Sequence, residues 1–211
     1  MLKLNMLLSG VLDNHPKRVV PEPALCVVTR FGMVVIKKQG VFSMRNHDKT
    51  AKRIAVTAVT AAIYVVFTVI LPIPSYSFMQ YRASEILNLL VFYNPIFAPG
   101  IILGCLIANM FSPYLVLDMV FGTLATVLAL FFIRKTRKLH LATLPPIIFN
   151  APIIALVILL AIGSPYSLTN YFIYMAWVAL GQFAVMVLTA YPLFKMLEKK
   201  NPKFIEFIKN I

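Results

Sequence analysis

The sequence contains long apolar runs that almost no charged residue interrupts. Between Ile54 and Phe132 the charged residues are Arg82, Glu85 and Asp118. A run of about 20 apolar residues is long enough to cross the hydrocarbon core of a bilayer as a helix. Within lipid, backbone polar groups must bond to one another, so such runs favour a bundle of transmembrane helices.

The overall composition supports the same class. Of the 211 residues, 60% are hydrophobic and 13% are charged, whereas about 25% of a soluble domain is charged. The net charge of +13 could suggest a nucleic-acid partner, but the basic residues form clusters between the apolar runs. Such clusters are typical of cytoplasmic membrane loops. We therefore expect an all-α membrane protein that binds no nucleic acid.

The first 43 residues differ from the rest of the chain. They contain the stretch "HPKRVVPEP" and no apolar run long enough to span a bilayer. Met44 opens the segment "MRNHDKTAKR", which leads directly into a spanning run. We expect residues 44–211 to form the membrane domain, residues 1–43 to be an extension, and translation to start at Met44.

The charge pattern predicts six transmembrane helices. Basic clusters lie before the first apolar segment, after the fourth and after the last, and six crossings place all three clusters on the cytoplasmic side. Both termini are then cytoplasmic, and the second helix is short. The expected segments are Ile54–Ile73, Ser84–Tyr93, Pro95–Phe111, Tyr114–Ile133, Leu144–Ile162 and Tyr171–Phe194.

This topology brings polar and aromatic residues from distant segments to the outer half of the membrane. Ionisable residues inside a membrane commonly mark a functional site, and convergent polar groups are typical of a binding pocket. The candidate substrate-binding residues are Arg82, Glu85, Asn109, Asp118, Tyr174, Trp177 and Gln182.

Structural roles are open for several of these residues. Arg82 could reach lipid headgroups or pair with Glu85, and Asp118 could cap a neighbouring helix. Tyr174 and Trp177 could belong to an aromatic belt at the membrane interface. Gln182 could be a hydrogen-bonding contact between helices.

A row of alanines marks the first span: Ala51, Ala55, Ala58 and Ala62 recur at three- and four-residue steps. Small residues at this spacing let another helix approach closely. The row therefore indicates either a contact within the bundle or a docking face for a separate membrane subunit.

The sequence lacks the motifs of several enzyme classes. It has no glycine-rich phosphate-binding loop and no HExxH motif, and Cys26 and Cys105 show no metal-binding spacing. We expect no metal and no cofactor. A small intramembrane enzyme that uses Glu85 and Asp118 as acid and base remains an alternative, as does a structural membrane subunit.

Three motifs resemble those of a known family. They are "QYRASEIL" at 80–87, "GCLIAN" at 104–109 and "DMVFGTLAT" at 118–126. Together they resemble the QueT family, the substrate-binding (S) components of energy-coupling factor (ECF) transporters for queuosine precursors. The resemblance extends from about Thr50 to Lys195.

The resemblance implies an importer subunit in a bacterial cell membrane. It implies a site open to the outside, a transmembrane coupling protein, and two ATPases as partners. The alanine row then resembles the docking face of such S components. The substrate would be a 7-deazaguanine, with riboflavin or thiamine as alternatives.

The chemistry of a 7-deazaguanine suggests roles for the candidate residues. Its ring N–H and amino group suit the Glu85 carboxylate, and its carbonyl suits a side-chain donor such as Asn109 or Gln182. The flat ring could stack on Trp177 or a tyrosine, and an aminomethyl group could pair with Asp118.

Overall fold

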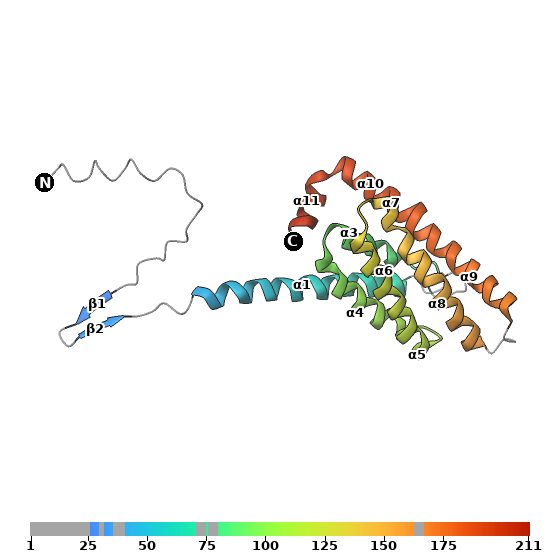
Figure 1. Ribbon diagram of the computed structural model, residues 1–211, viewed down its shortest axis with the longest axis horizontal. Coiled ribbons are helices and arrows are strands. Elements are labelled where there is room, and N and C mark those ends of the chain that lie inside the picture. The colour runs from blue at the N-terminus through green and yellow to red at the C-terminus, as the bar shows by residue number, and fades with distance from the viewer. Residues whose placement is uncertain (1–25, 30–31, 36–40, 71–74, 76–79, 163–166) are drawn as a thin grey trace. The chain divides into compact units, whose positions relative to one another are not determined.

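The computed structural model describes residues 26–29, 32–35, 41–70, 75, 80–162 and 167–211. Two compact units, Met1–Asp48 and Lys49–Ile211, divide the chain. In the first unit, β1 (Cys26–Thr29) and β2 (Gly32–Val35) pair antiparallel, with Cys26 opposite Val35 (Figure 1). Most of the predicted 1–43 extension otherwise lies outside the described residues.

Helices make up the regular structure of the described residues in Lys49–Ile211 (Figure 1). The all-helical class predicted for the membrane domain is confirmed there. In chain order the elements are α1 (Val41–Ile70), η1 (Ala83–Leu89), α3 (Leu90–Tyr93), η2 (Pro95–Phe97), α4 (Ala98–Asn109), α5 (Leu115–Leu117), η3 (Asp118–Gly122), α6 (Thr123–Lys135), α7 (Leu139–Ala142), α8 (Leu144–Ile162), α9 (Leu168–Phe183), η4 (Ala184–Ala190), α10 (Tyr191–Lys200) and α11 (Pro202–Asn210).

Four helical stretches in the described chain are long and apolar enough to cross a membrane. They are Lys49–Ile70, Leu115–Lys135, Leu139–Ile162 and Leu168–Lys200.

Two shorter apolar helices, Ala83–Tyr93 and Pro95–Asn109, correspond to the second and third predicted spans. In Ala83–Tyr93 a 3₁₀ segment of seven residues precedes an α segment of four. At about 2 Å and 1.5 Å of rise per residue, this helix is roughly 20 Å long, less than the ~30 Å of a hydrocarbon core.

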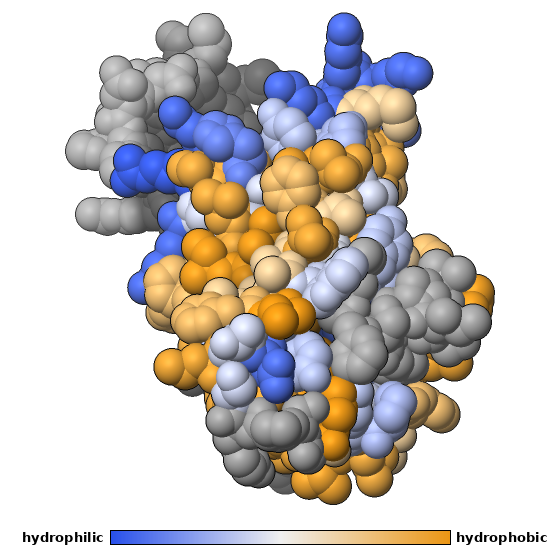
Figure 2. All heavy atoms as spheres, turned by 90° about the vertical axis from the view of Figure 1, so that its right-hand side faces the viewer, coloured by the Kyte–Doolittle hydropathy of each residue, from blue (hydrophilic) through white to orange (hydrophobic). Residues whose placement is uncertain are grey.

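The outside of the helical domain is apolar. Large hydrophobic side chains such as Ile70, Val116 and Leu188 are each at least 64% exposed. Hydrophobic residues cover much of the face shown in Figure 2, and hydrophilic residues gather towards its top. Such extensive apolar exposure is unusual for a soluble protein and suits a surface in contact with lipid.

Helix α4 packs closely on α1 because two glycines of α4 face it. A methyl group added at Gly104 would lie 2.7 Å from Tyr64 Cβ and 2.9 Å from the Ala61 carbonyl oxygen. One added at Gly100 would lie 2.7 Å from the Thr57 carbonyl oxygen. Because Gly100 and Gly104 have no side chain, α4 can lie closer to α1 than any larger residue would allow.

We predict that Gly104→Ala destabilises the domain, because the added methyl group forces α4 away from α1. Overpacking of this kind costs about 1–3 kcal/mol, so the thermal unfolding midpoint in detergent should fall. Ala176→Val, on the exposed face of α9, is the control and should leave the midpoint unchanged. Equal midpoints for Gly104→Ala and wild type would contradict the close packing.

Candidate functional site

A group of polar side chains lies inside the helical domain, and we call it the polar cluster. Its members come from α1, η1 and the residue before it, α4, η3, α8 and the turn before α5, and each is at most 7% exposed. Side-chain hydrogen bonds and one ion pair connect them into two groups, one around Glu85 and one around Asp118. The backbone N–H of Glu85 donates to the Arg82 carbonyl oxygen at 3.0 Å and joins the two groups. The polar cluster consists of Tyr64, Arg82, Glu85, Asn88, Asn109, Ser112, Asp118 and Asn150.

The Glu85 carboxylate is one centre of the polar cluster. Asn88 Nδ2 donates to Glu85 Oε2 at 2.5 Å, and Tyr64 Oη and Asn150 Nδ2 each donate to Oε1 at 3.5 Å. The donors lie on η1, α1 and α8. Glu85 therefore holds three helices together through one side chain that is 1% exposed.

The 3₁₀ geometry of η1 explains the close approach of Asn88 to Glu85. A 3₁₀ helix has three residues per turn, so side chains three positions apart lie directly above one another. Glu85 and Asn88 are three positions apart. The wider α-helical turn would offset the two side chains.

Asp118 is the second centre of the polar cluster. Arg82 Nη2 lies 3.9 Å from Asp118 Oδ2, and Ser112 Oγ donates to the same oxygen. Asn109 Nδ2 donates to the Asp118 carbonyl oxygen at 2.8 Å. Asp118 begins η3, a π-helical turn, and such turns are frequent at functional sites.

Several buried acceptor atoms have no hydrogen-bond donor among the described residues. They are Asn88 Oδ1, Asn109 Oδ1, Asp118 Oδ1 and Gln182 Oε1. Leaving a buried polar atom unpaired costs about 1–3 kcal/mol, so these oxygens suit a ligand that brings N–H donors. The arrangement favours binding of a small, donor-rich polar molecule.

Comparison with known proteins identifies the family. The sequence profile of the QueT transporter family matches residues 54–199. This chain belongs to the QueT transporter family. The family's matched region contains the whole polar cluster, and membership indicates a role in transport rather than catalysis.

One similar curated protein is the queuosine precursor transporter QueT of Lactococcus lactis subsp. cremoris (strain MG1363). It is 35% identical to this chain over 79 residues, which cover 36% of this chain and 46% of that protein. The match thus spans less than half of the length of this QueT relative. No solved structure matches the chain.

The structure brings together four of the residues predicted for the substrate site of this QueT-family chain: Arg82, Glu85, Asn109 and Asp118. Gln182 is also buried, at 1% exposed, and its Oε1 is unpaired among the described residues. Binding of a ligand by these residues stays a prediction.

The two aromatic candidates on α9 lie elsewhere. Trp177 is 45% exposed on the surface of the helix. Tyr174 is half-buried and packs against a small apolar cluster that includes Ile154 and Val178. The structure therefore does not bring Trp177 into the polar cluster.

Four members of the polar cluster are not among the substrate-binding residues predicted from the sequence: Tyr64, Asn88, Ser112 and Asn150. Asn88 follows Glu85 by three positions, and this spacing was a usable signal. Tyr64 enters from α1, and no local sequence pattern marks it. Among the described residues, no group of three His, Cys, Asp or Glu side chains could hold a metal ion.

The four alanines predicted as a docking face, Ala51, Ala55, Ala58 and Ala62, are all exposed on α1. The contact of α1 with α4 instead uses Thr57, Thr60, Ala61 and Tyr64. The alanine row therefore lies on the surface of the domain.

We predict that Arg82→Met destabilises the domain by about 3–5 kcal/mol, because it leaves the Asp118 carboxylate buried without its cation. The double variant Arg82→Met/Asp118→Leu removes both charges and should recover most of the loss. Thermal unfolding of the single and double variants in detergent gives the interaction free energy between the Arg82 and Asp118 side chains. Additive losses in the double variant would show that the two side chains do not interact.

Proposed function

We propose that this chain is the substrate-binding S component of an ECF importer and that it captures a queuosine precursor of the 7-deazaguanine type. The proposal rests on three buried oxygens in the polar cluster that have no hydrogen-bond donor among the described residues: Asn88 Oδ1, Asn109 Oδ1 and Asp118 Oδ1. The family membership and the name of the Lactococcus relative support the substrate class.

A 7-deazaguanine has the groups that the polar cluster needs. Its ring N–H and exocyclic amino group form a paired donor edge, and a carboxylate accepts two such bonds side by side. Glu85 is the proposed acceptor. Asn109 and Gln182 amides contact the rest of the ring system, and Asp118 Oδ1 receives the cation of an aminomethyl form.

Arg82 has a positioning role in this proposal, because it neutralises Asp118 when no cationic substrate is present. Tyr174 is the proposed aromatic wall, since it is half-buried. We leave Trp177 out of the proposed pocket because its ring is on the outer surface of α9.

We further propose six membrane crossings with both termini in the cytoplasm of a bacterium. The two short apolar helices account for the second and third crossings. Basic clusters at 49–53, 134–140 and 195–203 then lie on one side, in agreement with the positive-inside rule. Residues 44–211 form the transport domain, and residues 1–43 are an extension.

Transport needs partners in this proposal. The sequence carries no phosphate-binding loop, so two ATPase subunits supply the energy through a transmembrane coupling protein. The exposed alanine row of α1 is the surface where the coupling protein docks. The chain makes no covalent change to its substrate.

We predict that Glu85→Gln weakens binding of a 7-deazaguanine precursor about tenfold to a hundredfold, because hydrogen bonds to a charged acceptor contribute about 1.5–3 kcal/mol. Titration calorimetry with the detergent-purified protein measures the affinity.

The control is Glu198→Gln, which removes an exposed carboxylate from α10 and should leave the affinity unchanged. A Glu85→Gln variant that folds and binds with wild-type affinity would remove Glu85 from the site. Equal weakening by both variants would indicate a general charge effect.

We predict that Ala58→Leu separates substrate binding from coupling. The larger side chain blocks close approach of a partner helix, whereas the polar cluster is untouched. The variant should bind substrate within twofold of wild type but lose copurification with the coupling protein. Ala176→Leu, on the exposed face of α9, is the control and should retain the complex. Retention of the complex by Ala58→Leu would place the docking surface elsewhere.

A further inference from the structure

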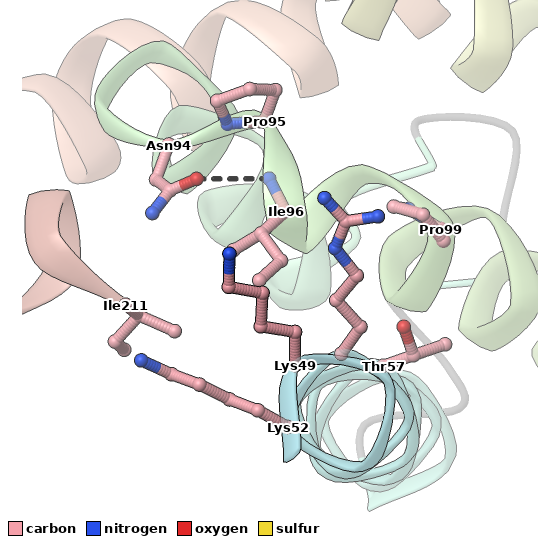
Figure 3. A pocket seen from close by; sticks show the side chains of 9 residues that line it. Lys49, Lys52, Thr57, Asn94, Pro95, Ile96, Pro99 and Ile211 are labelled. Atoms are coloured by element: carbon pink, nitrogen blue, oxygen red, sulfur yellow. Dashed lines mark hydrogen bonds between the residues drawn. The ribbon is translucent and has the colours of Figure 1, made fainter. Parts of the chain in front are cut away.

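The helical domain has an open pocket, separate from the polar cluster. Its volume is about 700 Å³, and it lies between the start of α1, the segment around η2 and the end of the chain. In Figure 3 the side chains of Lys49 and Lys52 extend from α1 towards this space. The lining residues are Lys49, Lys52, Arg53, Thr57, Asn94, Pro95, Ile96, Pro99 and Ile211.

The charge of this basic pocket favours an anion. Three of the lining side chains are cationic, and none of the described side chains that line the pocket is acidic. Lys49, Lys52 and Arg53 lie within five consecutive residues and are exposed. They give the pocket a local concentration of positive charge that attracts an anion.

Three of the α1 residues that line the basic pocket, Lys49, Arg53 and Thr57, lie on the face of α1 opposite the alanine row, and Lys52 lies between the two faces. Successive residues of an α-helix are turned by about 100°. This rotation places Lys49 and Arg53 on the side of Thr57, which contacts α4, and places Ala55 and Ala58 on the other side. The pocket is therefore distinct from the surface proposed for the coupling protein.

The walls of the basic pocket indicate what kind of anion fits. Pro95, Ile96, Pro99 and Ile211 supply apolar surface beside the cations, and Asn94 and Thr57 supply polar groups. The pocket also lies at the charged end of the apolar stretch Lys49–Ile70, at the level where a spanning helix meets lipid headgroups. A ligand with a phosphate group and an apolar chain would contact both the cationic and the apolar side chains of the pocket.

We propose that the basic pocket binds the phosphate of an acidic phospholipid, such as phosphatidylglycerol, at the membrane interface. Basic pockets between transmembrane helices on the cytoplasmic side are suited to lipid phosphates. A zwitterionic lipid is a poorer ligand, because its own ammonium group meets the three cations. Inorganic phosphate shares the anionic group but lacks the apolar body.

The test is native mass spectrometry of the delipidated full-length protein. The probes are short-chain phosphatidylglycerol and phosphatidylcholine of the same chain length. Wild type should bind one phosphatidylglycerol at least tenfold more tightly than phosphatidylcholine. Lys52→Gln/Arg53→Gln should lose about tenfold or more in affinity for phosphatidylglycerol, since each cation near a lipid surface contributes about 1 kcal/mol.

The matched control is Arg137→Gln/Lys138→Gln, which removes the same charge from exposed positions between α6 and α7 and should change the affinity by less than twofold. Equal losses in the two double variants would overturn the proposal, because they would show non-specific attraction. Equal binding of the two lipids by wild type would also overturn it, and would indicate that an anion of the protein itself satisfies the cations.

Inorganic phosphate distinguishes the source of the anion. Failure of millimolar inorganic phosphate to displace phosphatidylglycerol supports the lipid assignment. Displacement at that concentration would overturn it, since the free ion would then be recognised without the apolar body.

Discussion

Three charged side chains are buried in a domain with an apolar outer surface, and the groups that pair with them determine how its helices pack. Arg82, Glu85 and Asp118 are each at most 3% exposed, and a buried charge without partners costs several kcal/mol. Each charge is therefore held by groups from other helices. Those partners fix η1 against α1 and α8, and bring η3 to the same place.

The apolar helices could be predicted from the sequence, because the length of a hydrophobic run is a local property. Clustering of Arg82, Glu85, Asn109 and Asp118 followed from the expected topology. Tyr64 could not be found, since its role arises from a contact with Glu85 across 21 positions of the chain. Trp177 was expected to face inwards, but one position on an apolar helix does not determine which side contacts lipid.

Helix α1 contributes residues to the polar cluster, the alanine row and the basic pocket. On one side of the helix, Tyr64 hydrogen-bonds to Glu85 and the glycines of α4 pack closely. The opposite side exposes the alanine row, and the charged end lines the basic pocket. A helix that touches the proposed substrate site, the proposed partner surface and the proposed lipid site is well placed to link substrate occupancy with docking. Tight packing transmits small shifts along such an element.

Equilibrium binding by the detergent-purified wild-type chain, without partner subunits, decides whether this domain recognises a queuosine precursor. The ligands are the free-base, cyano and aminomethyl 7-deazaguanine precursors, with riboflavin and thiamine as comparisons. We predict saturable, sub-micromolar binding of one precursor at one site per chain, without turnover and without comparable binding of either vitamin. A folded protein that binds none of the precursors, or that prefers a vitamin, would contradict this prediction.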